Sequence, residues 1–217
     1  MKKRLKCGAL ALTLVLALGL LAGCGPATTG GGDEDPGSAP EETPQSETEL
    51  LSGKHHVQIA VQDYGTITLE LDADAAPVTV TNFVNLAKSG FYDGLTFHRV
   101  ASGFVLQGGD PNGDGTGGSG EAITGEFSEN GWDNPISHVR GTISMARAED
   151  YDSASSQFFI VLQDADYLDG KYAAFGTVTE GMETVDQICE QTPVADMYTG
   201  LVDAADQPVI TSITVVD

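Results

Sequence analysis

Residues 97–111 read FHRVASGFVLQGGDP, and they open the region that decides the fold. Two further stretches follow: GTISMAR at 141–147, and SSQFFI at 155–160, which continues as YLDGKYAAFG at 167–176. Each contains a short run of aromatic or β-branched residues next to glycine, serine or aspartate, the composition of short strands and their turns. Short strands and glycine-rich loops are therefore expected from about 95 to 180.

Outside this region, a period of two marks further strands. Apolar residues alternate over 57–61 and again over 67–71, and the residues between them, Asp63-Tyr64-Gly65, have the composition of a turn. This pattern predicts an antiparallel hairpin. A closing strand is expected over 209–216.

Two helices are expected as well. Pro77 suits a first helical turn, and Gly90 lies just past the last apolar residue of the pattern. A second helix is expected over about 182–190. Many strands with two helices, and no alternation of strand and helix, favour an antiparallel barrel capped by helices.

The three stretches, in this order and at these separations, resemble the signature blocks of the cyclophilin family of peptidyl-prolyl cis/trans isomerases. The resemblance covers roughly residues 56–217. It implies a mostly β fold, a closed eight-stranded antiparallel barrel capped by two α-helices. It also implies an outer groove that binds prolyl residues of polypeptide clients, and isomerisation of X-Pro bonds with no cofactor and no metal.

The same resemblance implies site residues. By position, Arg99 resembles the catalytic arginine. Tyr167 and Tyr172 stand where many members have Trp and His, and Arg147 replaces a common Asn, which matters little if its strand binds clients through the backbone. The other implied substrate-binding residues form apolar walls (Phe104, Val105, Phe159 and Leu168), polar members (Gln107 and Gln157) and, together with Arg147, an edge strand (Ala146 and Ala148).

Charge excludes one class of function. The chain has 10 Lys and Arg against 32 Asp and Glu, a formal net charge of −22. Four of the basic residues lie within the first six positions. Such an acidic chain repels nucleic acid, so no nucleic-acid partner is expected. A monomer is expected.

The first 23 residues have the pattern of a secretory signal: a basic start, an apolar run from about 7 to 21, and small residues before Cys24. Leu21-Ala22-Gly23-Cys24 resembles the lipobox of bacterial lipoproteins, which implies cleavage before Cys24 and its lipidation. The alternatives are a plain secretory signal or a short buried helix. The lipobox implies an extracytoplasmic domain anchored to the cell membrane, or to the periplasmic face of a membrane in a Gram-negative cell.

Between the signal and the hairpin the sequence is rich in Gly, Pro, Ser, Thr and acidic residues. It has too few large apolar side chains to offset the entropy of ordering the chain. The predicted organisation is therefore a signal peptide (1–23), a lipidated Cys24 with a disordered acidic tether (24–54), and the isomerase domain (55–217). Cys189 is the one cysteine of that domain, so it is expected to be a reduced, small core residue.

Other functions remain open from the sequence. The domain could bind prolyl peptides or act as a chaperone without catalysis, or the acidic tether could act by gathering cations. Residues 110–121 match a calcium-loop spacing but lack the preceding helix that such loops require. His98 and His138 have no recognisable partner nucleophile, so a hydrolytic triad is not expected.

Overall fold

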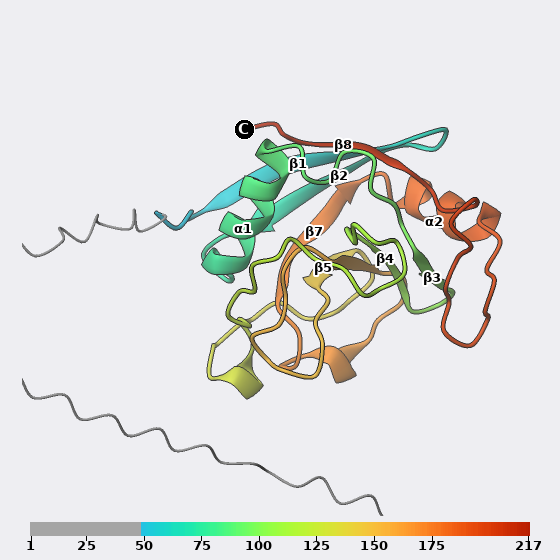
Figure 1. Ribbon diagram of the computed structural model, residues 1–217. Coiled ribbons are helices and arrows are strands. Elements are labelled where there is room, and N and C mark those ends of the chain that lie inside the picture. The colour runs from blue at the N-terminus through green and yellow to red at the C-terminus, as the bar shows by residue number, and fades with distance from the viewer. Residues whose placement is uncertain (1–48) are drawn as a thin grey trace, which may run out of the picture. The chain divides into compact units, whose positions relative to one another are not determined.

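The computed structural model describes residues 49–217 (Figure 1). The predicted signal peptide, Cys24 and most of the predicted tether lie outside these residues. In the part that is described, no helix combines the length and the apolar character needed to cross a membrane.

The described residues form one antiparallel sheet of eight strands in the order β3-β4-β6-β5-β7-β2-β1-β8, with two α-helices (Figure 1). The strands are β1 (Lys54–Val61), β2 (Gly65–Asp72), β3 (Arg99–Ala101), β4 (Val105–Gly108), β5 (Thr142–Met145), β6 (Phe158–Val161), β7 (Ala174–Glu180) and β8 (Ile210–Val215). The helices are α1 (Pro77–Lys88) and α2 (Met182–Gln191), and short 3₁₀ turns lie at Ser128–Asn130 and Asp166–Leu168.

The sheet is an open half-barrel, so the predicted closed barrel is wrong. β3 and β8 stand at the two edges of the sheet and do not pair along their lengths. The segments around the two edges meet irregularly instead: isolated bridges join Thr96 to Val209 and Arg99 to Leu201, and Ile210 exchanges backbone hydrogen bonds with Gly94 and Leu95. The Pro208 carbonyl accepts a hydrogen bond from the Phe97 N–H, but proline has no backbone N–H to donate in return. This prevents a regular ladder of hydrogen bonds between the two edges at this point.

The hairpin and both helices are confirmed. β1 pairs with β2 so that Val57 faces Leu69 and Ile59 faces Ile67. α1 begins at Pro77 as predicted, and Gly90, two residues past its end, has a positive φ of 73°. The first turn of α1 is held from a distance, because the buried Glu126 carboxylate accepts the N–H groups of Val78 and Thr79.

The core lies between α1 and the concave face of the sheet, and its centre is aromatic. The Phe83 ring packs against Tyr92, Phe158 and Phe175 with centroids 5.1, 5.5 and 5.2 Å away. Successive side chains of a strand point to opposite faces. Phe158 is therefore in this core, as predicted, whereas Phe159 joins a smaller cluster on the other face with Val105 and Leu168. That smaller cluster supports the candidate site.

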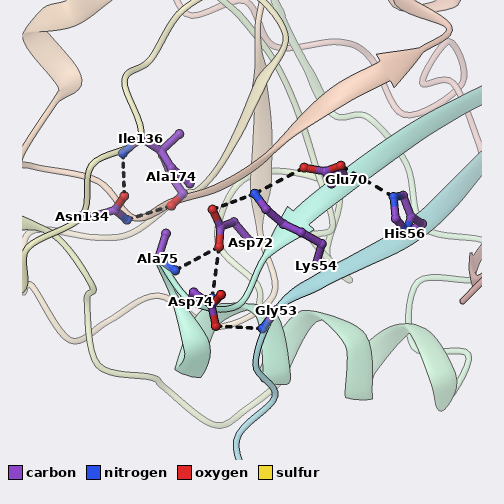
Figure 2. A network of polar contacts seen from close by, with 10 residues as sticks. All are labelled: Gly53, Lys54, His56, Glu70, Asp72, Asp74, Ala75, Asn134, Ile136 and Ala174. Atoms are coloured by element: carbon purple, nitrogen blue, oxygen red, sulfur yellow. Dashed lines mark hydrogen bonds and ion pairs between the residues drawn. The ribbon is translucent and has the colours of Figure 1, made fainter.

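The beginning of the domain is fixed by polar contacts (Figure 2). The Gly53 N–H donates to Asp74 at 2.8 Å, and the Lys54 ammonium lies 2.8 Å from Asp72 and 3.3 Å from Glu70. Leu51, three residues before β1, packs against the main core, and its N–H donates to the Thr81 hydroxyl. Residues 51–54, in the last part of the predicted tether, therefore belong to the folded domain.

Candidate active site

Most of the predicted site residues line a single pocket of about 320 Å³ on the convex side of the sheet. The pocket lies where β3, β4 and β6 are paired and where the 146–147 segment and the 168–172 loop cover them. Its lining consists of Arg99, Phe104, Val105, Gln107, Ala146, Arg147, Phe159, Leu168 and Tyr172. Residues from five separate stretches of the sequence thus meet at one pocket with mostly apolar walls, and two arginines, Arg99 and Arg147, lie at its sides.

Arg99 is held on two sides. On β3 it faces Gln107 of β4, whose side-chain oxygen accepts from Arg99 Nη1 at 3.0 Å. Arg99 Nε donates to the Thr199 carbonyl at 2.7 Å, and the guanidinium carbon lies 5.8 Å from the centre of the Phe104 ring. Within residues 49–217 no carboxylate is within ion-pair distance of Arg99. Burial lowers the pKa of Arg99, but a guanidinium remains charged, so its charge is available to a bound molecule.

The two predicted glutamines continue this arrangement as a chain of hydrogen bonds. Gln107 Nε2 donates to the Gln157 side-chain oxygen at 2.9 Å. Gln157 Nε2 donates in turn to the carbonyls of Gly115 and Gly117, at 3.1 and 2.8 Å. Because each amide donates at one end and accepts at the other, the orientation of both side chains is fixed, and with it the Nη1 side of Arg99.

The remaining predicted residues lie beside the pocket. Ala148 and Gln157 line an adjoining hollow of about 440 Å³ beneath the glycine-rich loop 115–120, which shares Gln107, Ala146 and Arg147 with the first. Tyr167 lines neither hollow. It is 59% exposed and stacks on Phe104 with ring centres 6.0 Å apart, at the outer edge of the pocket.

The Arg147 side chain is more deeply involved than the sequence suggested. Its guanidinium lies 4.8–5.2 Å from the ring centres of Tyr172, Tyr151 and Phe127. Its Nε donates to the Lys171 carbonyl, and Nη1 to the carbonyls of Ala148 and Glu149. The side chain thus fastens the edge segment to Tyr172, a wall of the pocket.

His138 has partners that the sequence did not indicate. Its Nδ1 lies 2.8 Å from Asp169 and its Nε2 lies 2.9 Å from the Ser144 hydroxyl. Ser144 is fully buried, which makes it inaccessible to a substrate. The imidazole instead stacks on Phe159 at 6.1 Å and supports the pocket wall from behind. Burial lowers the pKa of His138 although Asp169 acts in the opposite direction.

The loop after β4 is held by its own aspartate. The buried Asp110 carboxylate accepts the N–H groups of Asn112, Asp114 and Gly115, so its oxygens are engaged by the backbone. Within residues 49–217 no group of three or more His, Cys, Asp or Glu side chains is arranged to hold a metal ion. Cys189 lies on α2 and packs against the core, and burial raises the pKa of its thiol to about 12.

Comparisons with known proteins identify the family. The family model described as cyclophilin type peptidyl-prolyl cis-trans isomerase/CLD matches residues 56–215. A peptidyl-prolyl cis-trans isomerase of Helicobacter pylori (strain ATCC 700392 / 26695) is 51% identical over 126 residues, which are 57% of this chain and 74% of the relative. Peptidyl-prolyl cis-trans isomerase B of Bacillus subtilis (strain 168) is 50% identical over 123 residues, 57% of this chain and 82% of the relative.

A solved structure is similar over almost its whole length. The crystal structure of a cyclophilin type peptidyl-prolyl cis-trans isomerase of Cryptosporidium parvum has a TM-score of 0.66 and 30% identity, covering 76% of this chain and 99% of that one. The fold, the matched sequence blocks and the pocket that they form lead to the same conclusion. The chain belongs to the family of cyclophilin-type peptidyl-prolyl cis-trans isomerases and is an enzyme of that class.

Proposed function

We propose that this isomerase accelerates X-Pro rotation through Arg99, by binding the half-rotated peptide bond more tightly than either planar form. Amide resonance gives the peptide bond a rotation barrier of about 18–20 kcal/mol. Twisting the bond breaks resonance and places lone-pair density on the prolyl nitrogen. A donor aimed at that nitrogen, or at the adjacent carbonyl, therefore lowers the barrier without a nucleophile or a proton transfer.

The observation that carries this proposal is that hydrogen bonds hold the Arg99 guanidinium, which has no ion-pair partner within residues 49–217, beside the apolar walls of the pocket. Gln107 and the Thr199 carbonyl hold Arg99 from two directions, so little reorganisation is needed when charge develops on the substrate. Phe104, Phe159 and Leu168 supply apolar surface for a proline ring and exclude water, which strengthens the charged interaction. A second crystal structure of the same Cryptosporidium parvum enzyme, 31% identical with a TM-score of 0.65, was solved in the presence of the dipeptide Ala-Pro, which is consistent with a prolyl ligand.

The test is Arg99→Ala, measured by a protease-coupled or NMR-exchange assay on a proline-containing peptide. Turnover should fall about 10²–10³-fold, the usual loss when one transition-state donor is removed. Arg140→Ala is the matched control, because Arg140 pairs with Asp186 outside the pocket. Full activity of the Arg99→Ala chain would refute the mechanism.

We further propose that the enzyme acts on exported or surface proteins from a lipid anchor at Cys24. The support is the sequence alone: a basic and apolar leader that ends in Leu21-Ala22-Gly23-Cys24. Two or more acyl chains would make the attachment stable, whereas one chain binds only reversibly. Cys24→Ala should move the enzyme from the membrane to the soluble fraction and abolish globomycin-sensitive processing. Unchanged fractionation of that variant would contradict the anchor.

A further inference from the structure

The loop between α2 and β8 carries two neighbouring apolar side chains in full contact with solvent. Met197 is 94% exposed and Tyr198 is 98% exposed, against 59% for Tyr167 at the pocket edge. Scattered exposed apolar residues are ordinary on a protein surface. Two successive apolar side chains that are almost fully exposed, at the tip of one loop beside an active site, suggest a binding surface.

The tip is fixed in place. The Asp196 carboxylate accepts the Tyr198 N–H at 2.8 Å and the Thr199 hydroxyl at 2.9 Å. The Gly200 N–H donates to the Asp196 carbonyl at 2.7 Å, which closes the turn. Gly200 has a φ of 79°, and a Cβ there would lie 2.8 Å from the Val100 carbonyl oxygen, so the chain approaches β3 as only glycine allows. Met197 and Tyr198 are therefore held outward by a structured turn.

The same turn contacts the proposed catalytic group. The Thr199 carbonyl accepts a hydrogen bond from Arg99 Nε at 2.7 Å, and the Gly200 carbonyl accepts one from the Val100 N–H at 2.8 Å. Figure 1 shows this segment, in dark red, descending from α2 beside β3. Successive Cα atoms are about 3.8 Å apart, so the Met197 and Tyr198 backbones lie within about 8 Å of Thr199. The tip thus stands on the Arg99 flank of the pocket, where Phe104 and Tyr167 already form an apolar border.

Charge narrows what this tip can bind. The chain has a formal net charge of −22, and Asp196 lies at the base of the tip itself, so an anionic lipid surface would be repelled. An unfolded polypeptide whose proline occupies the pocket must, in contrast, continue past its borders. On the 146–148 side that polypeptide meets the hollow beneath the glycine-rich loop. On the Arg99 side it meets Met197 and Tyr198.

We propose that Met197 and Tyr198 bind apolar residues of the client polypeptide that flank its X-Pro bond. The inference rests on the proposed function, because it assumes that the proline occupies the Arg99 pocket. Its consequence is a preference for unfolded segments in which the proline has apolar neighbours, which are the segments a folded client would bury.

The test compares substrates on the full-length chain and on a Met197→Ser/Tyr198→Ser variant. One substrate is a prolyl tetrapeptide; another is a peptide of about twelve residues, spanning about 40 Å when extended, with Leu and Phe on both sides of a central Ala-Pro bond. The ratio of kcat/KM for the long peptide to that for the short one should fall about 3–10-fold in the variant. A long peptide with Ser in place of Leu and Phe should show no such fall. Leu50→Ser removes a half-exposed apolar side chain that precedes β1 and lines neither hollow of the site, and it is the matched control.

Each other outcome overturns the proposal. An equal loss on both peptides would mean that the tip acts through Thr199 on Arg99, and an unchanged ratio would mean that it binds nothing relevant. Binding of the parent chain to anionic vesicles that the variant loses would assign the tip to a membrane. Fluorescence polarisation of the labelled long peptide measures affinity without turnover. If Arg99→Ala kept full activity, the proposed mechanism would fail. The affinity of the parent chain and of the Met197→Ser/Tyr198→Ser variant for the long peptide would still show whether the tip binds the client.

Discussion

His138 shows how much a single buried residue can do for this pocket. The imidazole is 1% exposed, is bonded at both nitrogens, and stacks on Phe159. In the neutral ring Nδ1–H can donate to Asp169 while Nε2 accepts from the Ser144 hydroxyl. Burial disfavours the charged ring and lowers the pKa of His138, so the folded domain favours the neutral form.

This gives a prediction for stability against pH. Burial lowers the pKa of His138 in the folded state, so on acidification the unfolded chain takes up the proton first. The free energy of unfolding should fall as the pH drops from about 6.5, the unfolded value, towards the lower folded pKa. One titrating group contributes at most about 1.4 kcal/mol per pH unit to the slope of the unfolding free energy against pH. The contribution of His138 should disappear in His138→Gln. Urea unfolding between about pH 7 and pH 5 measures it.

Ser144→Ala is the control for that experiment. It removes the hydrogen bond to Nε2 but keeps the titrating ring, so its curve should be lower than that of the parent chain and retain the slope. His98 also has a pKa lowered by burial, with Asp110 and Asp114 acting against it, and contributes in the same direction in both chains. Parallel curves for the parent and His138→Gln would refute the assignment to His138.

Whether a contact of the site could be predicted from the sequence depends on whether a side chain or the backbone makes it. Arg99 and the two glutamines could be predicted because their side chains lie in ordered sequence blocks. The role of Thr199 could not be predicted, because it holds Arg99 through its backbone carbonyl, 100 residues away in the sequence. Every residue type has such a carbonyl, so the sequence does not indicate this contact. The partners of His138 were missed because Ser144 and Asp169 lie on separate elements that only the fold brings together.

At the scale of elements, local patterns predicted most of the structure. The hairpin of β1 and β2 and the two helices follow from periodicity and from Pro77 and Gly90. Contacts between distant elements were not predictable in this way. The Glu126 carboxylate caps α1 from a loop 47 residues away from Thr79, and Arg147 joins an edge segment to aromatic rings from three other places.

The Arg147 contact predicts a measurable cost. Arg147→Ala removes three cation–π contacts and three hydrogen bonds, so the free energy of unfolding should fall by about 1–2 kcal/mol. KM for a prolyl peptide should rise more than kcat falls, because Tyr172 loses its support while Arg99 keeps its own. Arg147→Lys retains the charge but not the planar fork, and should recover less than half of the loss. Activity and stability equal to those of the parent in Arg147→Ala would contradict this role.

At the scale of the whole molecule, the sequence implied a closed barrel and the structure is open. The family blocks lie within β3 to β7 and say little about how β8 meets β3. That meeting depends on residues 192–209, where Pro208 interrupts the ladder and the Met197–Tyr198 tip turns outward. The loop that leaves the sheet open is thus the same loop that braces Arg99.

The place at which the chain enters the sheet has a mechanical consequence. The residues that precede β1 join the domain at Leu51 and Gly53, and β1 lies between β2 and β8, hydrogen-bonded to both. A pull from the N-terminal side therefore runs along an inner strand and loads many hydrogen bonds at once, instead of peeling an edge strand one bond at a time. A force between the N-terminal side and a polypeptide bound in the pocket would therefore be resisted at β1 by the hydrogen bonds to both of its neighbours.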